Sequence, residues 1–317
     1  MKRTRHIILI LLVFVLILSL IGCKKKNTDI EETKRETPDL IREESKDEKA
    51  RDRLMAEFAE LMDNKSLDLL VEFADSNIGN FSSIEADEIL LGLQEILEEN
   101  IARGAIFKDY RGELMEIAGG EMFFPRDRIG DIGDQKLRAD IERAFKNKYK
   151  LINMEGQFYP VVDYEELRAY DDYVSSQVRD YIDIRASMSN EPMAVDAALI
   201  ISYDKLADRI LQLEDYLKDY PQGKKYEEIL GFYEDWLWVY LNGLPNTPIE
   251  DQDTKIVYKD VYESYKRIGN TKDSATGLIV SKYIDRIGEN KGLIDESILE
   301  KNTDLIDEAL FLLKASK

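Results

Sequence analysis

Histidine and cysteine are almost absent from this 317-residue chain. The single histidine is His6 and the single cysteine is Cys23, and beyond residue 23 the chain has neither. This excludes Ser-His-Asp and Cys-His nucleophilic catalysis, the HExxH zinc motif, and ordinary zinc or copper sites with His or Cys ligands. Any catalysis would depend on carboxylates, lysine or tyrosine, or on a hard cation bound by oxygen ligands.

Residues that interrupt helices are also few. The chain has 7 prolines and 17 glycines, and 34% of its residues are charged. Apolar residues recur at three- and four-residue spacing in nearly every segment, which is typical of amphipathic helices. We therefore expect a mainly α fold, either a multi-helix bundle or an irregular α-superhelix, with one short β-hairpin near residues 149–162.

Basic residues are outnumbered by acidic ones. The 44 Lys and Arg residues against 64 Asp and Glu residues give a formal net charge of −20. Proteins that bind nucleic acid show the opposite balance, so we expect no nucleic-acid partner. The acidic excess suits a solvated surface, and it also suits cationic or metal ligands.

The N-terminal region has a composition of its own. Residues 2–5 are Lys-Arg-Thr-Arg, residues 7–18 are uninterruptedly apolar, and Leu20-Ile21-Gly22-Cys23 follows. A basic segment, an apolar segment and a small-residue cleavage site in this order predict an export signal. Leu20-Ile21-Gly22-Cys23 resembles the lipobox of bacterial lipoproteins. In that family a diacylglyceryl group is attached to the cysteine sulfur, and a dedicated peptidase cleaves before the cysteine.

The resemblance implies a signal peptide over 1–22, lipidation of Cys23, and an extracytoplasmic protein anchored by lipid to the bacterial cell membrane. An uncleaved membrane-spanning helix is the alternative. The apolar run 7–18 is shorter than the roughly 20 residues that such a helix needs, which favours the lipoprotein. Two acyl chains anchor a protein stably, so the membrane is one expected partner.

Residues 23–48 are predicted to form a lipidated, disordered tether. From residue 27 to about residue 49 the chain is almost entirely charged or small and polar, and such a segment cannot bury enough apolar surface to fold alone. The C-terminal part of this segment could instead extend the first helix. The cluster Lys24-Lys25-Lys26 either contacts anionic headgroups or simply begins a soluble spacer.

The remainder is predicted as an N-terminal helical part (49–148), a β-hairpin (149–162) and a C-terminal helical part (163–317). A single domain over 49–317 fits the pattern equally well. The hairpin has strand-forming residues on both sides of Gly156, with Pro160 permitted only at an edge. The C-terminal part is predicted to begin with a helix over 163–186.

The longest predicted helix covers residues 192–220, and the next covers 223–242. Leu199, Tyr203, Leu206, Ile210, Leu213, Leu217 and Tyr220 follow alternating four- and three-residue steps in the first of them. Pro221 and Gly223 end that helix, so the two are expected to form an antiparallel pair at the centre of the C-terminal part.

The helix 223–242 supplies the candidate ligand-binding residues Trp236, Trp238 and Tyr240. Aromatic side chains beside carboxylates suit a carbohydrate or peptide cleft, and Tyr159 could face the same groove. The alternative is that this helix is the most buried one of the bundle. Trp238 is the member expected to reach the surface.

Residues 119–134 contain glycines and the candidate metal ligands Asp127, Asp131 and Asp134. Carboxylates on a tight loop can bind Ca²⁺, but their spacing is not that of an EF-hand. The alternative is that Asp134 caps the next helix and that the other two carboxylates are solvated.

These observations favour a non-enzymatic helical lipoprotein that binds a small ligand or an unidentified envelope protein. The runner-up hypothesis is an extracytoplasmic enzyme that acts on glycans with carboxylates, with a hard divalent cation as an optional cofactor. A transport-type solute-binding lipoprotein would need two α/β lobes, which the helical pattern does not predict.

Overall fold

Helix α1 (Pro38–Asn64) begins the part of the chain that the computed structural model describes, which is the backbone of residues 38–102 and 111–315 and the side chains of 48–102 and 112–315. The predicted signal peptide over 1–22, Cys23 and the predicted tether as far as residue 37 lie outside the described residues. Residues Lys49–Lys317 form one compact unit, and the description below concerns this unit.

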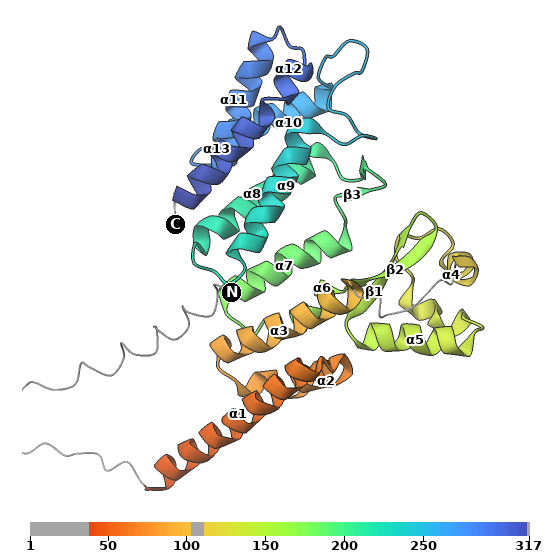
Figure 1. The fold of residues 1–317 in the computed structure, drawn as a ribbon, viewed down its shortest axis with the longest axis vertical. Coiled ribbons are helices and arrows are strands. Elements are labelled where there is room, and N and C mark those ends of the chain that lie inside the picture. The colour runs from red at the N-terminus through yellow and green to blue at the C-terminus, as the bar shows by residue number, and fades with distance from the viewer. Residues whose placement is uncertain (1–37, 103–110, 316–317) are drawn as a thin grey trace, which may run out of the picture. The chain divides into compact units, whose positions relative to one another are not determined.

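The prediction of a mainly α fold is confirmed in the described residues. Twelve further α-helices follow α1 in chain order, with three 3₁₀ helices between them (Figure 1). The helices are α2 (Leu67–Asn77), η1 (Ile78–Asn80), α3 (Ser83–Ala102), α4 (Arg111–Ala118), η2 (Arg126–Asp131), α5 (Gln135–Lys146), α6 (Tyr164–Leu167), η3 (Arg168–Tyr170), α7 (Ser176–Asn190), α8 (Tyr203–Asp219), α9 (Tyr226–Asn242), α10 (Lys259–Gly269), α11 (Ala275–Glu289), α12 (Glu296–Leu299) and α13 (Asn302–Ala315).

The predicted β-hairpin is confirmed as strands β1 (Tyr149–Met154) and β2 (Gln157–Val162), which pair antiparallel. The turn between them places Gly156 at φ +78°, a backbone conformation that favours glycine. Pro160 lies opposite Leu151 in this two-stranded sheet. Phe123 forms an antiparallel bridge to Ile152, so β1 lies between β2 and the segment that precedes η2.

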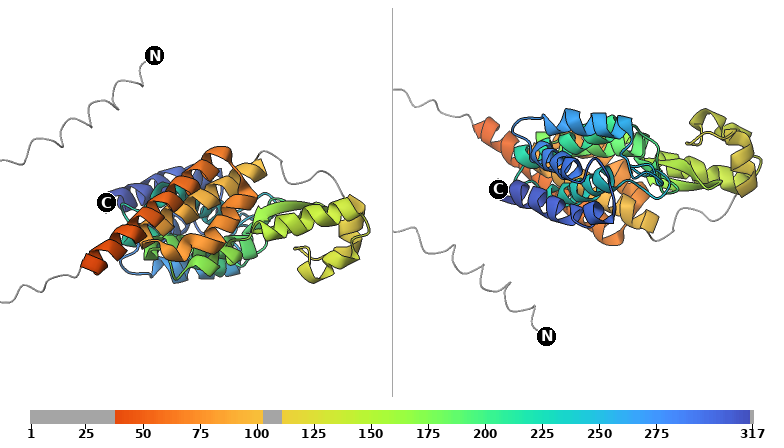
Figure 2. Two further views of the ribbon diagram at one scale, coloured as in Figure 1. Left: turned by 90° about the horizontal axis from the view of Figure 1, so that it is seen from below. Right: turned by 90° about the horizontal axis from the view of Figure 1, so that it is seen from above.

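The apolar side chains are buried in two separate clusters. The larger cluster joins α2, α3, α7 to α11 and α13, and it includes both α8 and α9. The smaller cluster lies among α4, α5 and the β1–β2 hairpin, and it includes Leu151 and Phe158. Both views of Figure 2 show the hairpin, α4 and α5 grouped at one end of the unit. We call this group, residues 111–162, the hairpin lobe.

The larger core contains several buried tyrosines whose hydroxyls form hydrogen bonds inside it. Tyr265 donates to the backbone carbonyl of Tyr240 at 2.8 Å, and Tyr283 donates to that of Leu241 at 3.0 Å. Tyr240 and Ser264 share a bond of 2.8 Å between their hydroxyls. Satisfied hydroxyls allow these rings to be buried without loss of hydrogen bonding. The fully buried tyrosines are Tyr149, Tyr181, Tyr226, Tyr233, Tyr240, Tyr265 and Tyr283.

The prediction of one helix over 192–220 is wrong in its first third. Residues 194–199 form a second small hairpin of strands β3 (Ala194–Val195) and β4 (Ala198–Leu199), and α8 begins only at Tyr203. The loop after α9 imposes this conformation: Asn246 donates to the carbonyls of Ala197 and Asp196, and Leu199 N donates to Thr247 Oγ1 at 3.0 Å. Tertiary hydrogen bonds thus override the local helical pattern.

The predicted helix over 163–186 is also interrupted. Residues 171–175 separate η3 from α7, which then continues to Asn190. Asp87 of α3 fixes the interruption, because its carboxylate accepts from Ser175 N at 2.8 Å and from Ser175 Oγ at 2.7 Å. Asp87 is 2% exposed, so this is a buried tertiary contact that the sequence of residues 163–186 cannot reveal.

No helix in the described part of the chain has the length and apolar character needed to cross a membrane.

Candidate functional site

An open pocket of about 470 Å³ lies where α2, the C-terminal part of α3, α5 and the first residue of β1 meet. Its volume is within the range of about 300–1,000 Å³ that is usual for small-molecule sites. We call it the α2–α5 pocket. Two basic, two acidic and two amide side chains dominate its lining: Lys65, Arg143, Asp68, Asp140, Asn100 and Asn147.

One wall of the pocket is an ion pair between α2 and α5. Arg143 Nε donates to Asp68 Oδ1 at 3.1 Å, and Arg143 Nη2 donates to Asp68 Oδ2, so the contact is bidentate. The hydrogen bond from Arg143, with a further one from Asn147, holds the pKa of Asp68 below its ordinary value of 3.8 against the effect of burial. Asp68 is therefore a fixed negative charge at neutral pH and cannot act as a general acid.

Asn147 is the most buried polar side chain of the pocket lining, with 4% of its surface exposed. Its Nδ2 donates to Asp68 Oδ1, but its Oδ1 accepts no hydrogen bond from any described residue. A buried amide oxygen without a donor costs about 1–3 kcal/mol.

The turn that enters α2 forms another part of the lining. Lys65 adopts φ +50°, and its Nζ donates to Glu99 at 2.6 Å. Ser66 is the N-cap of α2, yet its side chain makes no capping hydrogen bond. The first turn of a helix carries N–H groups without intrahelical acceptors, so this wall offers hydrogen-bond donors to the pocket.

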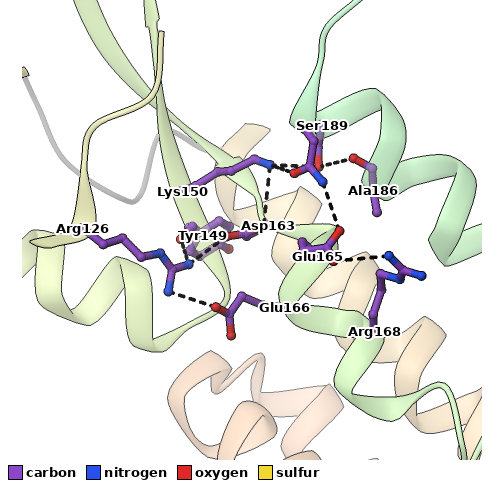
Figure 3. A network of polar contacts seen from close by, with 10 residues as sticks. Arg126, Tyr149, Lys150, Asp163, Glu165, Glu166, Arg168, Ala186 and Ser189 are labelled. Atoms are coloured by element: carbon purple, nitrogen blue, oxygen red, sulfur yellow. Dashed lines mark hydrogen bonds and ion pairs between the residues drawn. The ribbon is translucent and has the colours of Figure 1, made fainter. Parts of the chain in front are cut away.

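Tyr149 connects the pocket with a polar network on the other side of β1. Its hydroxyl donates to the carbonyl of Leu97 at 2.9 Å, and its own carbonyl accepts from Arg126 at 3.3 Å. Arg126 also donates to Asp163 at 2.8 Å and to Glu166 at 3.1 Å (Figure 3). The hairpin lobe is thereby fastened to the residues around α6.

Lys150 occupies the centre of this network. Figure 3 shows its side chain reaching from β1 towards α7, where Nζ donates to Ser189 Oγ at 3.2 Å and to Asn190 Oδ1 at 2.5 Å. Asp163 Oδ1 lies 3.6 Å from the same Nζ. Burial lowers the pKa of Lys150, and the charge of Asp163 counteracts this. Through these contacts Lys150 fastens the hairpin lobe to α7.

The four predicted ligand-binding residues do not share one environment. Trp236 is 7% exposed and Tyr240 is fully buried, and both belong to the larger core. Trp238, on the opposite side of α9, is 47% exposed, and Tyr159 is 41% exposed on strand β2. Glu234 and Asp235 lie on the exposed side of α9.

The three predicted metal ligands are likewise used separately. Asp134 is the N-cap of α5 and accepts from Lys136 N at 2.8 Å and Leu137 N at 3.0 Å. Asp131 forms an ion pair of 2.9 Å with Arg128, and Asp127 lies in η2. Among the residues that the structure describes, no three His, Cys, Asp or Glu side chains are grouped to hold a metal ion.

The residues of the α2–α5 pocket could not be predicted from the sequence, because they come from segments that are distant along the chain. Asp68 and Arg143 are separated by 75 residues, and neither belongs to a local motif. The only local signal is Ser66, which the pattern identifies as a helix start. Comparison of the chain with protein-family models, with curated proteins and with solved structures gives no match.

Proposed function

We propose that this chain is an extracytoplasmic lipoprotein of the bacterial cell envelope that binds a small polar ligand in the α2–α5 pocket. The proposed extracytoplasmic localisation is supported by the basic and apolar segments that precede Leu20-Ile21-Gly22-Cys23. The binding role is supported by the pocket itself, and above all by Arg143 in its lining, whose side chain is 69% exposed although it pairs with Asp68.

The lining indicates the kind of ligand. Side chains of both charges stand beside amides, so a ligand with hydroxyl or amine donors and an anionic group fits best. Arg143 is the residue to bind the anionic group, because its side chain is 69% exposed and its guanidinium carries five N–H donors, of which the bidentate contact with Asp68 uses two. Amino acids, short peptides and acidic sugars have this chemistry.

The test is a thermal-shift screen of the full-length protein in detergent micelles against amino acids, dipeptides, cell-wall and plant oligosaccharides, and divalent cations. A ligand at 100 times its Kd adds about 2.7 kcal/mol to the free energy of unfolding. For a unit of this size the expected rise in Tm is at least about 2 °C. A screen in which no compound raises Tm would contradict the small-ligand proposal, and cross-linking at the cell surface would then look for a protein partner.

Two variants test whether a compound that raises Tm binds in the α2–α5 pocket. Arg143→Ala and Asn147→Ala are expected to weaken the shift, whereas Arg179→Ala on α7 should leave it unchanged, because Arg179 is exposed and outside the pocket lining. A ligand that binds all three variants equally well binds elsewhere, and that result would contradict the assignment.

A further inference from the structure

A second pocket lies in the C-terminal part of the unit and differs from the first in charge. It has a volume of about 580 Å³ and is formed by the loop between α9 and α10 together with the segment that leads into α12. Four carboxylates and a single ammonium group line it, with two aliphatic side chains between them. These residues are Glu250, Asp295, Glu296, Glu300, Lys255, Ile294 and Leu299.

Glu250 distinguishes this pocket from an ordinary acidic surface. It is 7% exposed, while Glu296 and Glu300 are exposed. Apart from its own backbone N–H, no described residue donates a hydrogen bond to its carboxylate. The nearest cation is Lys255, whose Nζ lies 3.8 Å from Oε1, which is beyond hydrogen-bond distance.

The free energy of burying a carboxylate is unfavourable unless donors or an opposite charge compensate it. Burial raises the pKa of Glu250, and the partly exposed Lys255 only counteracts this. Glu250 is therefore a buried acceptor that faces a cavity and has an incomplete set of partners.

The backbone around Glu250 is held in place by other contacts. Glu250 bridges Val257, Ile256 bridges Leu293, and Ile294 N donates to the carbonyl of Lys255 at 2.8 Å. Asp295 is occupied as the N-cap of α12, where it accepts from Ser297 N at 3.0 Å. The carboxylates that remain for a ligand are Glu250 at the base of the pocket and Glu296 and Glu300 at its rim.

We propose that this pocket binds an aliphatic amine, with the ammonium group at Glu250 and the carbon chain against the partly exposed Leu299. The ammonium group would supply the donors that Glu250 lacks. The rim carboxylates would attract a second amino group of a diamine or polyamine. An organic cation fits better than a metal ion, because Leu299 gives a carbon chain an apolar contact and the described carboxylates are not grouped as metal ligands. Lys255 occupies the place of the ligand when none is bound.

Isothermal titration calorimetry of the full-length protein in detergent micelles tests this proposal with putrescine, spermidine and a blocked tripeptide that contains lysine. The two free amines and the peptide distinguish a soluble polyamine from a lysine side chain as the source of the ammonium group. Glu250→Gln keeps the size of the side chain and is expected to weaken binding about tenfold or more. Glu234→Gln, an exposed glutamate of α9, is the matched control and should bind like the wild type.

Lys255→Met provides a second, independent readout. If Lys255 occupies the place of the ligand, its removal should tighten amine binding by up to about fivefold. Absence of amine binding to the wild type would overturn the proposal. So would equal binding by the wild type and Glu250→Gln, because general attraction by the acidic surface would then explain the heats.

Discussion

Glu214 of α8 accepts two hydrogen bonds from Thr276 in the first turn of α11, from the backbone N at 2.9 Å and from Oγ1 at 2.5 Å. Ala275 N donates to Glu214 at 2.8 Å and Ser274 Oγ donates at 2.9 Å, while Lys218 forms an ion pair at 2.6 Å. With 1% of its surface exposed, Glu214 is a buried cap supplied to α11 by another helix.

Replacement of Glu214 by glutamine is expected to destabilise the protein by about 2–4 kcal/mol. The substitution removes the charge and places an amide donor against backbone donors that then lack an acceptor. The corresponding fall in Tm is roughly 4–16 °C, measurable by calorimetry. Asp215→Asn, at the neighbouring exposed position, is the control and should change stability by less than about 0.5 kcal/mol. Equal Tm values for the two variants would contradict this role.

Glu214 also makes the stability of the folded protein decrease at acidic pH. Burial by itself raises the pKa of Glu214, but the hydrogen bonds from Lys218, Thr276 and Ser274 outweigh it and hold the pKa below the ordinary 4.5. A carboxyl group with a lowered pKa in the folded state contributes stability above its unfolded pKa, and this contribution is lost as pH falls through the folded value. Urea unfolding measures this at pH 7 and below pH 4.5. Between these pH values the free energy of unfolding should decrease less for Glu214→Gln than for the wild type.

The tyrosines of the core predict a delayed alkaline titration. Burial raises the pKa of Tyr233, Tyr240, Tyr265 and Tyr283 well above the ordinary value of 10. Their protonated form therefore stabilises the folded state below pH 10, and this stability is lost as pH rises above it, because the unfolded chain ionises first. Tyrosinate absorbance should rise near pH 10 for exposed residues only, with the rest appearing at the unfolding transition. Ionisation of all tyrosines near pH 10 in the folded protein would contradict this.

The two tryptophans should respond in opposite ways to substitution. Trp236→Ala removes a side chain that is 7% exposed and is expected to cost about 3–5 kcal/mol, whereas Trp238→Ala, at 47% exposure, should cost less than about 1 kcal/mol. Fluorescence separates them, because the chain has no other tryptophan. Acrylamide should quench Trp236→Phe, which keeps Trp238, more strongly than Trp238→Phe. The reverse order would show that α9 is turned the other way.

The proposed anchor is tested separately at Cys23. Cys23→Ala should leave an unprocessed precursor and abolish labelling by radioactive fatty acid in a bacterial host, because no other cysteine is present. Ser19→Ala, four residues before the cysteine, is a control that should still be processed and labelled. Normal lipid labelling of Cys23→Ala would refute the lipoprotein assignment.

Features set by neighbouring residues could be predicted from the sequence. The three-residue spacing of Ser82 and Glu85 is that of a capping box, and the structure has both of its bonds: Ser82 N donates to Glu85 at 2.9 Å and Glu85 N donates to Ser82 Oγ at 3.4 Å. The hairpin at 149–162 follows from strand-forming residues around a glycine turn. The exposure of Trp238 follows from helical periodicity on α9.

Features set by distant residues could not be predicted. The segment 194–199 has an apolar pattern that fits a helix, and only contacts with Asn246 and Thr247 make it a hairpin. Asn147 lies in a segment predicted to be helical, but its role depends on Asp68 of α2. Neither candidate pocket could be predicted for the same reason, since the lining residues of each come together only through tertiary folding.

The hydrogen-bonded tyrosines of the core also limit how the helices can slip. In a purely aliphatic interface, one helix can move past its neighbour by a turn and find similar contacts. Here Tyr265 and Tyr283 each bond one particular carbonyl of α9, so a displaced helix would leave buried hydroxyls without partners. The tyrosines therefore select one alignment of α9, α10 and α11 over its near alternatives, a contribution to conformational uniqueness that burial of apolar area alone does not make.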